Sequence, residues 1–174
     1  MAIADVSSRS IAELIDLTGK VAVVTGGAQG LGKAISRRFA EAGASVVSGD
    51  VNADGAQATV RELAASTGGN LRGTAVDVRK TASIDALAQK AVDELGGFDI
   101  WVNNAGVYPT TDVLAMSDAD WDDVVAINLR GSFTGSRTAA RHMVERGQGG
   151  GSSRGAKIRR PWAMLSSAAP SSAV

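Results

Sequence analysis

The chain has 174 residues, of which 44% are hydrophobic and 21% charged, with no cysteine and one histidine. This composition suits one domain with a real core, and it excludes a disordered chain, a disulfide framework and a thiolate or multi-histidine metal site. The net charge of zero hides a balance of −4 up to Arg146 and +4 after it, which indicates two stretches of different kind. No stretch is apolar enough to span a bilayer and no apolar signal core begins the chain, so we expect a cytoplasmic protein without a membrane partner.

Strands and helices alternate in the first part of the chain. Short β-branched runs predict strands at residues 20–25, 44–50, 71–77 and 98–102. A helical pattern of apolar residues follows each of the first three strands, and glycines end these patterns at Gly43, Gly68 and Gly96. Strands that alternate with such helices form right-handed βαβ units, so we expect four strands in one parallel sheet.

A long helical stretch follows the fourth strand. Ser117 to Asp120 resembles a capping box with Asp in place of Glu, and the helical pattern runs from about Trp121 to Arg146. Gly135 either divides this stretch into two helices or weakens it.

The pattern ends near Gly147. Residues 147–174 contain four basic residues, no acid, and many Gly and Ser, and we find no strand or helix period in them. We therefore predict an N-terminal extension at 1–16, a partial α/β domain at 17–146 and a disordered tail at 147–174. The tail bases lack interleaved aromatic residues, so nucleic acid is not an expected partner.

A glycine-rich turn, Thr-Gly-Gly-Ala-Gln-Gly-Leu-Gly at residues 25–32, joins the first strand to the first helix. Glycines allow a tight turn and a close approach of the backbone to an anion, and the helix directs its positive end at that anion. A diphosphate is therefore the ligand that we expect at this turn. The alternative is an ordinary glycine-rich turn, which the position between a strand and a helix makes less attractive.

Polar residues stand at the carboxyl ends of the next three strands, on the edge where open α/β sheets bind ligands. Asp50 comes 18 residues after Gly32, where a carboxylate can accept hydrogen bonds from ribose hydroxyls and repel a 2′-phosphate, which favours NAD over NADP. The alternative for Asp50 is a solvated loop acid. Asp77 and the run Asn103-Asn-Ala-Gly end the third and fourth strands, and the two asparagines have structural and ligand roles open to them in equal measure.

Two further polar residues bear on the chemistry. Asn128 is polar on the inward stripe of its helix, where backbone groups are its simplest partners. His142 has no partner pattern for a nucleophilic triad, and we expect it on the surface of the last helix.

Together these residues resemble the short-chain dehydrogenase/reductase family, over roughly residues 17–150. The resemblance implies a Rossmann-like doubly wound sheet, a nicotinamide cofactor, and oxidation or reduction of a small alcohol or carbonyl substrate. It also implies a homo-oligomer that pairs through the helices at 121–146. It assigns a catalytic role to Asn128 and cofactor contacts to Thr25, Gly26, Gln29, Gly30, Leu31, Gly32, Asp50, Asp77, Val78, Asn103, Asn104, Ala105 and Gly106.

The chain departs from the family in its last part. The family uses a Ser after the fifth strand and a Tyr-x-x-x-Lys pair, whereas the only tyrosine here is Tyr108, with Asp112 four residues on. Ser167 sits in a similar Ser-Ser pair, but no apolar strand leads into it, so we do not expect it to be catalytic. We expect an incomplete sheet whose later strands are missing, from a truncated or frame-shifted chain. Three readings remain: a dehydrogenase with little activity of its own, a non-catalytic dinucleotide-binding module, and a non-functional remnant.

Overall fold

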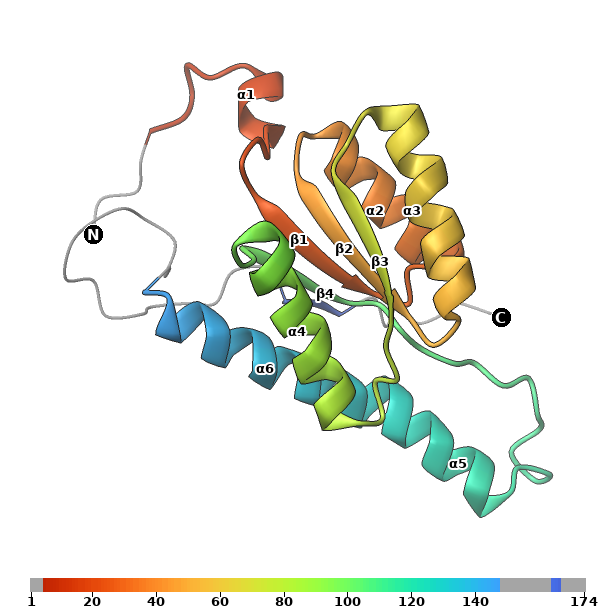
Figure 1. The fold of residues 1–174 in the computed structure, drawn as a ribbon. Helices are drawn as coiled ribbons and strands as arrows, with labels where there is room; N and C mark the ends of the chain where they lie inside the picture. The colour runs from red at the N-terminus through yellow and green to blue at the C-terminus, as the bar shows by residue number, and fades with distance from the viewer. Residues whose placement is uncertain (1–4, 148–163, 167–174) are drawn as a thin grey trace.

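The structure is a computed structural model that describes residues 5–147 and 164–166. Its centre is a parallel sheet in the order β3-β2-β1-β4-β5 (Figure 1). The four predicted strands are confirmed, with a strand boundary moved by one or two residues in most cases. The strands are β1 (Val21–Thr25), β2 (Ser45–Asp50), β3 (Leu71–Ala75), β4 (Ile100–Asn103) and β5 (Met164–Ser166).

Helices cover both faces of the sheet (Figure 1). Side chains alternate along a strand, so neighbours face opposite layers. Val23 and Trp101 are buried in the core under the helices α4 and α6, whereas Val24 and Val102 are buried in the core under α2 and α3. The doubly wound class is therefore observed. The helices are α1 (Ile11–Ile15), α2 (Gly30–Glu41), α3 (Ala53–Thr67), α4 (Thr81–Leu95), α5 (Asp118–Val124), the π-helical η1 (Val125–Gly131) and α6 (Ser132–Glu145).

The strand order indicates where a ligand can bind. The chain builds β1, β2 and β3 in one direction and then crosses to the other side of β1 to form β4. Loops leave the carboxyl ends of β1 and β4 on opposite sides at this point, and open α/β sheets bind ligands in the crevice between them.

The long helical stretch is divided at a place different from the one that the sequence suggested. Ser117 and Asp120 form the predicted capping box at the start of α5. The stretch changes character in η1, around Asn128, while Gly135 lies inside α6. Of the two alternatives at Gly135, a division of the helix there is not observed. This glycine allows close packing, because a Cβ atom there would lie 2.2 Å from Asn103 Oδ1.

Two short elements lie outside the predicted domain. The extension contains α1, whose capping box joins Ser10 and Glu13. In the tail, Met164–Ser166 pairs with β4 as a parallel strand, although we expected no strand after Gly147. Residues 148–163 and 167–174 of the tail, with Ser167, lie outside the described residues. Within the described chain, no helix combines the length and the hydropathy needed to cross a membrane.

His142 of α6 is less exposed than the surface position that we expected. Its ring stacks on buried Phe98, with centroids 4.8 Å apart, and is only partly exposed. Burial, and secondarily Arg146, lowers the pKa of His142 below its usual value.

Candidate functional site

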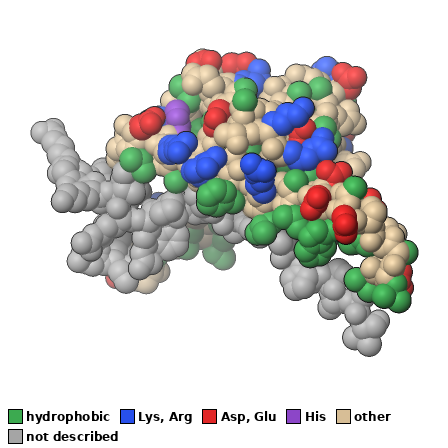
Figure 2. All heavy atoms as spheres, turned by 90° about the horizontal axis from the view of Figure 1, so that it is seen from below, with side chains coloured by type: hydrophobic (Ala, Val, Ile, Leu, Met, Phe, Trp, Pro, Cys, Tyr) green, Lys and Arg blue, Asp and Glu red, His purple; other side chains and the backbone are tan. Residues whose placement is uncertain are grey.

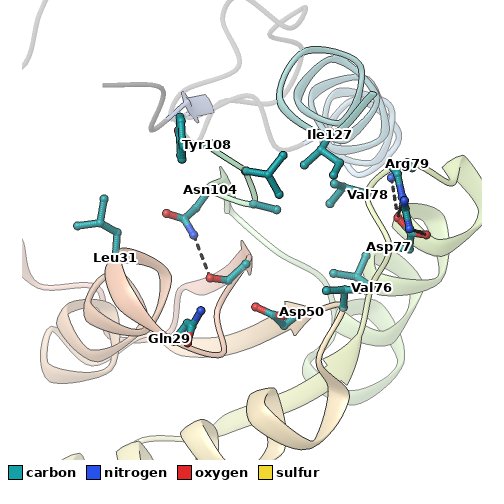
Figure 3. A pocket seen from close by; sticks show the side chains of 15 residues that line it. Gln29, Leu31, Asp50, Val76, Asp77, Val78, Arg79, Asn104, Tyr108 and Ile127 are labelled. Atoms are coloured by element: carbon teal, nitrogen blue, oxygen red, sulfur yellow. Dashed lines mark hydrogen bonds and ion pairs between the residues drawn. The ribbon is translucent and has the colours of Figure 1, made fainter. Parts of the chain in front are cut away.

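A cavity of about 470 Å³ opens at the carboxyl ends of the strands (Figure 3). This size lies within the range of small-molecule sites in proteins. Its lining comes from segments that are far apart in sequence, so the fold, and not local structure, assembles it. Nine predicted cofactor residues line it, namely Gly26, Gln29, Leu31, Asp50, Asp77, Val78, Asn104, Ala105 and Gly106.

In the glycine turn between β1 and α2, Gly26 and Gly32 leave no room for a side chain beside the backbone. Gly26 has a φ of 69°, and a Cβ atom there would lie 2.8 Å from Ala105 Cα. A Cβ atom on Gly32 would lie 2.0 Å from the Gly26 carbonyl oxygen. Gly26, Gln29 and Leu31 of this turn line the cavity beside the N-terminus of α2, where helix N–H groups and the helix dipole favour an anion.

Thr25 and Asn104 join the loops that follow β1 and β4. The buried Thr25 hydroxyl donates to the Val102 carbonyl at 3.3 Å and accepts from the Asn104 and Ala105 amides at 3.1 and 3.2 Å. The Asn104 side chain donates in return to the carbonyls of Thr25 and Gly26, both at 3.0 Å. Thr25 does not line the cavity, so the structure gives it a supporting place under the loops.

Asp50 ends β2 with its carboxylate at the cavity. One oxygen accepts from the Ala28 amide at 3.0 Å and the other from the Asn52 amide at 2.9 Å. Two backbone donors on different elements thus orient the group. It presents negative charge at the place where the sequence predicts a ribose contact.

Asp77 is a second carboxylate in the lining of the cavity, and its ion pair with Arg79 was not predicted from the sequence. Arg79 Nε and Nη2 donate to the two Asp77 oxygens at 3.0 and 3.1 Å (Figure 3). Arg79 Nη1 reaches Asp123 of α5 at 3.5 Å. Hydrogen bonding from the Arg79 side chain lowers the pKa of Asp77. The Asp-Val-Arg spacing was the available signal, because a side chain two residues after a strand-end acid can return to it.

Asn103, in contrast, points into the protein. It is 6% exposed, accepts from the Trp101 indole at 2.9 Å and donates to the Ser136 hydroxyl of α6 at 3.0 Å. It does not line the cavity. Of the two roles open to it, the geometry gives its side chain the structural one.

Asn128 lies in η1, and both ends of its amide bond to one residue. Its Oδ1 accepts from the Val107 amide and its Nδ2 donates to the Val107 carbonyl, both at 2.9 Å. These bonds hold the segment after β4 against the helix. π-Helical turns are rare and occur frequently at functional sites.

Some residues that line the cavity were not predicted, because no motif or pattern in the sequence marks most of them. The cavity also contacts Val51, Val76, Arg79, Val107, Tyr108 and Ile127. Tyr108 is 68% exposed at the rim. In the described part of the chain, no cluster of three His, Asp or Glu residues is placed to hold a metal ion.

Comparison with known proteins points to one family. Residues 20–152 match the family model described as short chain dehydrogenase. The chain is 42% identical over 133 residues to D-threitol dehydrogenase from Mycolicibacterium smegmatis, which covers 76% of this chain and 51% of that protein. It is 41% identical over 135 residues to 3beta-hydroxysteroid dehydrogenase 2 from Eggerthella lenta, over 77% of this chain and 52% of that protein.

A solved structure agrees with these relatives. The short-chain type dehydrogenase/reductase from Mycobacterium marinum matches with a TM-score of 0.77 and 35% identity, over 81% of this chain and 55% of that one. The chain therefore spans about half the length of the relatives that it matches.

Proposed function

This chain belongs to the short-chain dehydrogenase family, and from that premise we propose that its cavity binds NAD in preference to NADP. The observation that carries the proposal is the Asp50 carboxylate, which two backbone amides aim at the cavity beside the glycine turn. A carboxylate there accepts hydrogen bonds from ribose hydroxyls and repels a 2′-phosphate. Neither Val51 nor Asn52, which follow Asp50, supplies a positive charge to offset that repulsion.

We propose the following placement of a dinucleotide along the described residues. The diphosphate would lie on the backbone of residues 26–32, where an added Cβ atom at Gly26 or Gly32 would meet backbone atoms. Asp50 would hold the adenosine ribose, Asp77 and Val78 the adenine, and residues 104–106 the nicotinamide side. When bound, the cofactor supplies hydride transfer with a carbon of a small alcohol or carbonyl substrate, and the protein contributes binding and orientation.

The catalytic side of the proposal rests on Asn128. Its bonds to Val107 hold the loop that follows Gly106, so in this proposal Asn128 positions the wall where a substrate would meet the cofactor. The 174 residues contain no Tyr-x-x-x-Lys pair. A side chain that exchanges a proton with the substrate oxygen is therefore missing from them, and we expect little or no turnover from this chain.

The same absence favours a second candidate, a non-catalytic dinucleotide-binding module. The two candidates share the cavity and differ in turnover. A purified chain that binds NAD without changing its absorbance in the presence of alcohols or carbonyls supports the module.

We further propose that the chain pairs with a second copy through the helices at 121–146. Trp121, Leu129 and Phe133 are 59%, 68% and 61% exposed, which is unusual for large apolar side chains on one helical layer. Figure 2 views this side of the molecule and shows hydrophobic side chains gathered toward the α5 end. Sedimentation velocity of the wild type against Phe133→Glu tests the pairing, because a charge at the contact dissociates a dimer.

Calorimetric titration with NAD and with NADP tests the main proposal. We expect saturable NAD binding and a weaker NADP signal, and we expect Gly32→Ala to abolish both because its methyl group meets the Gly26 carbonyl. Circular dichroism of the variant checks that it still folds. A folded wild type that binds neither nucleotide contradicts the proposal.

A further inference from the structure

A threonine outside the cavity holds the glycine turn from behind. Thr59 lies on α3 and is 4% exposed, and its hydroxyl donates to the Ala28 carbonyl at 2.6 Å. Thr59 does not line the cavity. It is separated from Ala28 by 31 residues, so the bond ties α3 to the turn that follows β1.

The Ala28 residue is held on its other side as well. Its amide donates to Asp50, and its carbonyl accepts from Thr59. The amide belongs to the Gly27–Ala28 peptide and the carbonyl to the Ala28–Gln29 peptide. Because each peptide is planar, these two bonds fix two consecutive peptide planes just before α2 begins at Gly30.

Helix α3 is itself firmly seated, so it can impose a position on the turn. The Gln57 side chain donates to the Gly73 carbonyl of β3 at 2.7 Å, and a Cβ atom on Gly73 would lie 2.9 Å from the Ala56 carbonyl oxygen. A Cβ atom on Gly55 would lie 3.1 Å from the Ala28 methyl group. The helix therefore meets both the sheet and the turn at close contact, and Thr59 is the side chain that joins it to the turn by a hydrogen bond.

We propose that Thr59 is a positioning residue for dinucleotide binding. Its hydroxyl fixes the direction of the Ala28–Gln29 peptide and, with it, the Gln29 amide at the start of α2. It also keeps the Ala28 amide in place for Asp50. Both effects preorganise the turn, which lowers the conformational cost that a ligand meets on binding. This inference rests on the proposed NAD site and adds a residue that touches no ligand.

Three variants test it. Thr59→Val removes the hydroxyl and keeps the shape, and Thr59→Ser restores the hydroxyl. Thr138→Val is a matched control, because Thr138 is also buried, at 7% exposure, and donates its hydroxyl to Asp85 at 2.7 Å on the far side of the sheet. Each valine variant loses one hydrogen bond of a buried threonine hydroxyl, and the bond that Thr138 loses is to a carboxylate and therefore the stronger one. A larger effect of Thr59→Val on NAD binding therefore reports on the turn and not on general stability.

Two readouts are required: the NAD dissociation constant from calorimetry, and hydrogen exchange of the Ala28 and Gln29 amides in the protein without NAD. We expect Thr59→Val to weaken NAD binding about tenfold and to speed exchange at both amides. Thr59→Ser and Thr138→Val should bind NAD like the wild type.

Two outcomes overturn the inference: Thr59→Val binding NAD as tightly as the wild type, or Thr138→Val weakening it equally. If the wild type binds no NAD, the proposed function is wrong and the cofactor role of Thr59 is lost with it. The exchange experiment then decides separately whether Thr59 holds the turn, since unchanged exchange in Thr59→Val refutes that too.

Discussion

Replacing Gly135 by alanine adds one methyl group where α6 lies close against β4. A Cβ atom there would stand 2.2 Å from Asn103 Oδ1 and 3.0 Å from Trp101 Nε1. These two atoms share a buried hydrogen bond of 2.9 Å, and Asn103 also donates to Ser136. Atoms in ordinary contact are about 3.5 Å apart, so either α6 moves away from the sheet or the Asn103 amide leaves its place.

Helix propensity and packing predict opposite signs for this substitution. In a helix interior alanine is about 1 kcal/mol more favourable than glycine, so a helix without close neighbours gains stability. Displacing the Asn103 amide leaves the buried Trp101 N–H without an acceptor, which costs about 1–3 kcal/mol, and the lost bond to Ser136 costs about 1 kcal/mol. We therefore expect Gly135→Ala to lower the free energy of unfolding by about 1–3 kcal/mol.

Urea unfolding followed by circular dichroism measures this change. The control is the same substitution in an Asn103→Ala background, where the obstructing amide is absent and Gly135→Ala should lose most of its cost. Equal or greater stability of Gly135→Ala in the wild-type background refutes the packing argument, and so does an equal cost in both backgrounds.

Three further substitutions address charge. Asp50→Asn should reduce the ratio of NAD to NADP affinity about tenfold, because a neutral side chain no longer repels a 2′-phosphate; an unchanged ratio in calorimetry contradicts the assigned role. Burial lowers the pKa of His142, so the unfolded chain binds this proton more readily, and the free energy of unfolding should decrease as the pH falls through about 6.5. His142→Phe should remove that component of the unfolding free energy, and an identical pH profile refutes it. Arg79 lowers the pKa of Asp77, so the pair stabilises the fold above about pH 4 and less in acid. The stability deficit of Arg79→Gln should shrink as the pH falls, and a constant deficit across acid unfolding curves argues against the pair.

The sheet and most of the cavity could be predicted because their signals are local. A buried parallel strand is a short β-branched run, and glycine ends the patterns before and after it, as Gly43 and Gly68 do here. The carboxyl ends of such strands meet at one edge. That rule alone is enough to bring Gly26, Asp50 and Asn104 together from three distant segments.

The roles of individual side chains could not be predicted in the same way, because they depend on packing between distant elements. Glycine usually weakens a helix, yet Gly135 lies inside α6. Only the packing explains it, since Asn103 leaves no room for a methyl group there. Nothing in the sequence around Thr59 marks it as a partner of the glycine turn. Its hydrogen bond to Ala28 follows only from the approach of α3 to that turn. The π-helical η1 has no sequence signal of its own, and its Asn128 finds both partners in Val107.

The predicted cofactor motifs contain residues that line the cavity and residues that support it from behind. These two kinds of residue should respond differently to substitution. Thr25 and Asn103 do not line the cavity, so they act on a ligand only through other groups. Thr25 holds the backbone of the loop after β4, and Asn103 joins the side chains of Trp101 and Ser136. Changing them should alter stability and binding together. Asp50 presents its charge to the cavity itself, and the amides that it accepts from are those of two loops. Asparagine there keeps one acceptor oxygen and loses one of the two backbone bonds, so the change costs the fold about one partly exposed hydrogen bond. Because it also removes the charge that faces the cavity, its effect on the choice between NAD and NADP should exceed its effect on stability. The ratio of the effect on binding to the effect on stability therefore separates residues that line the cavity from residues that support its walls.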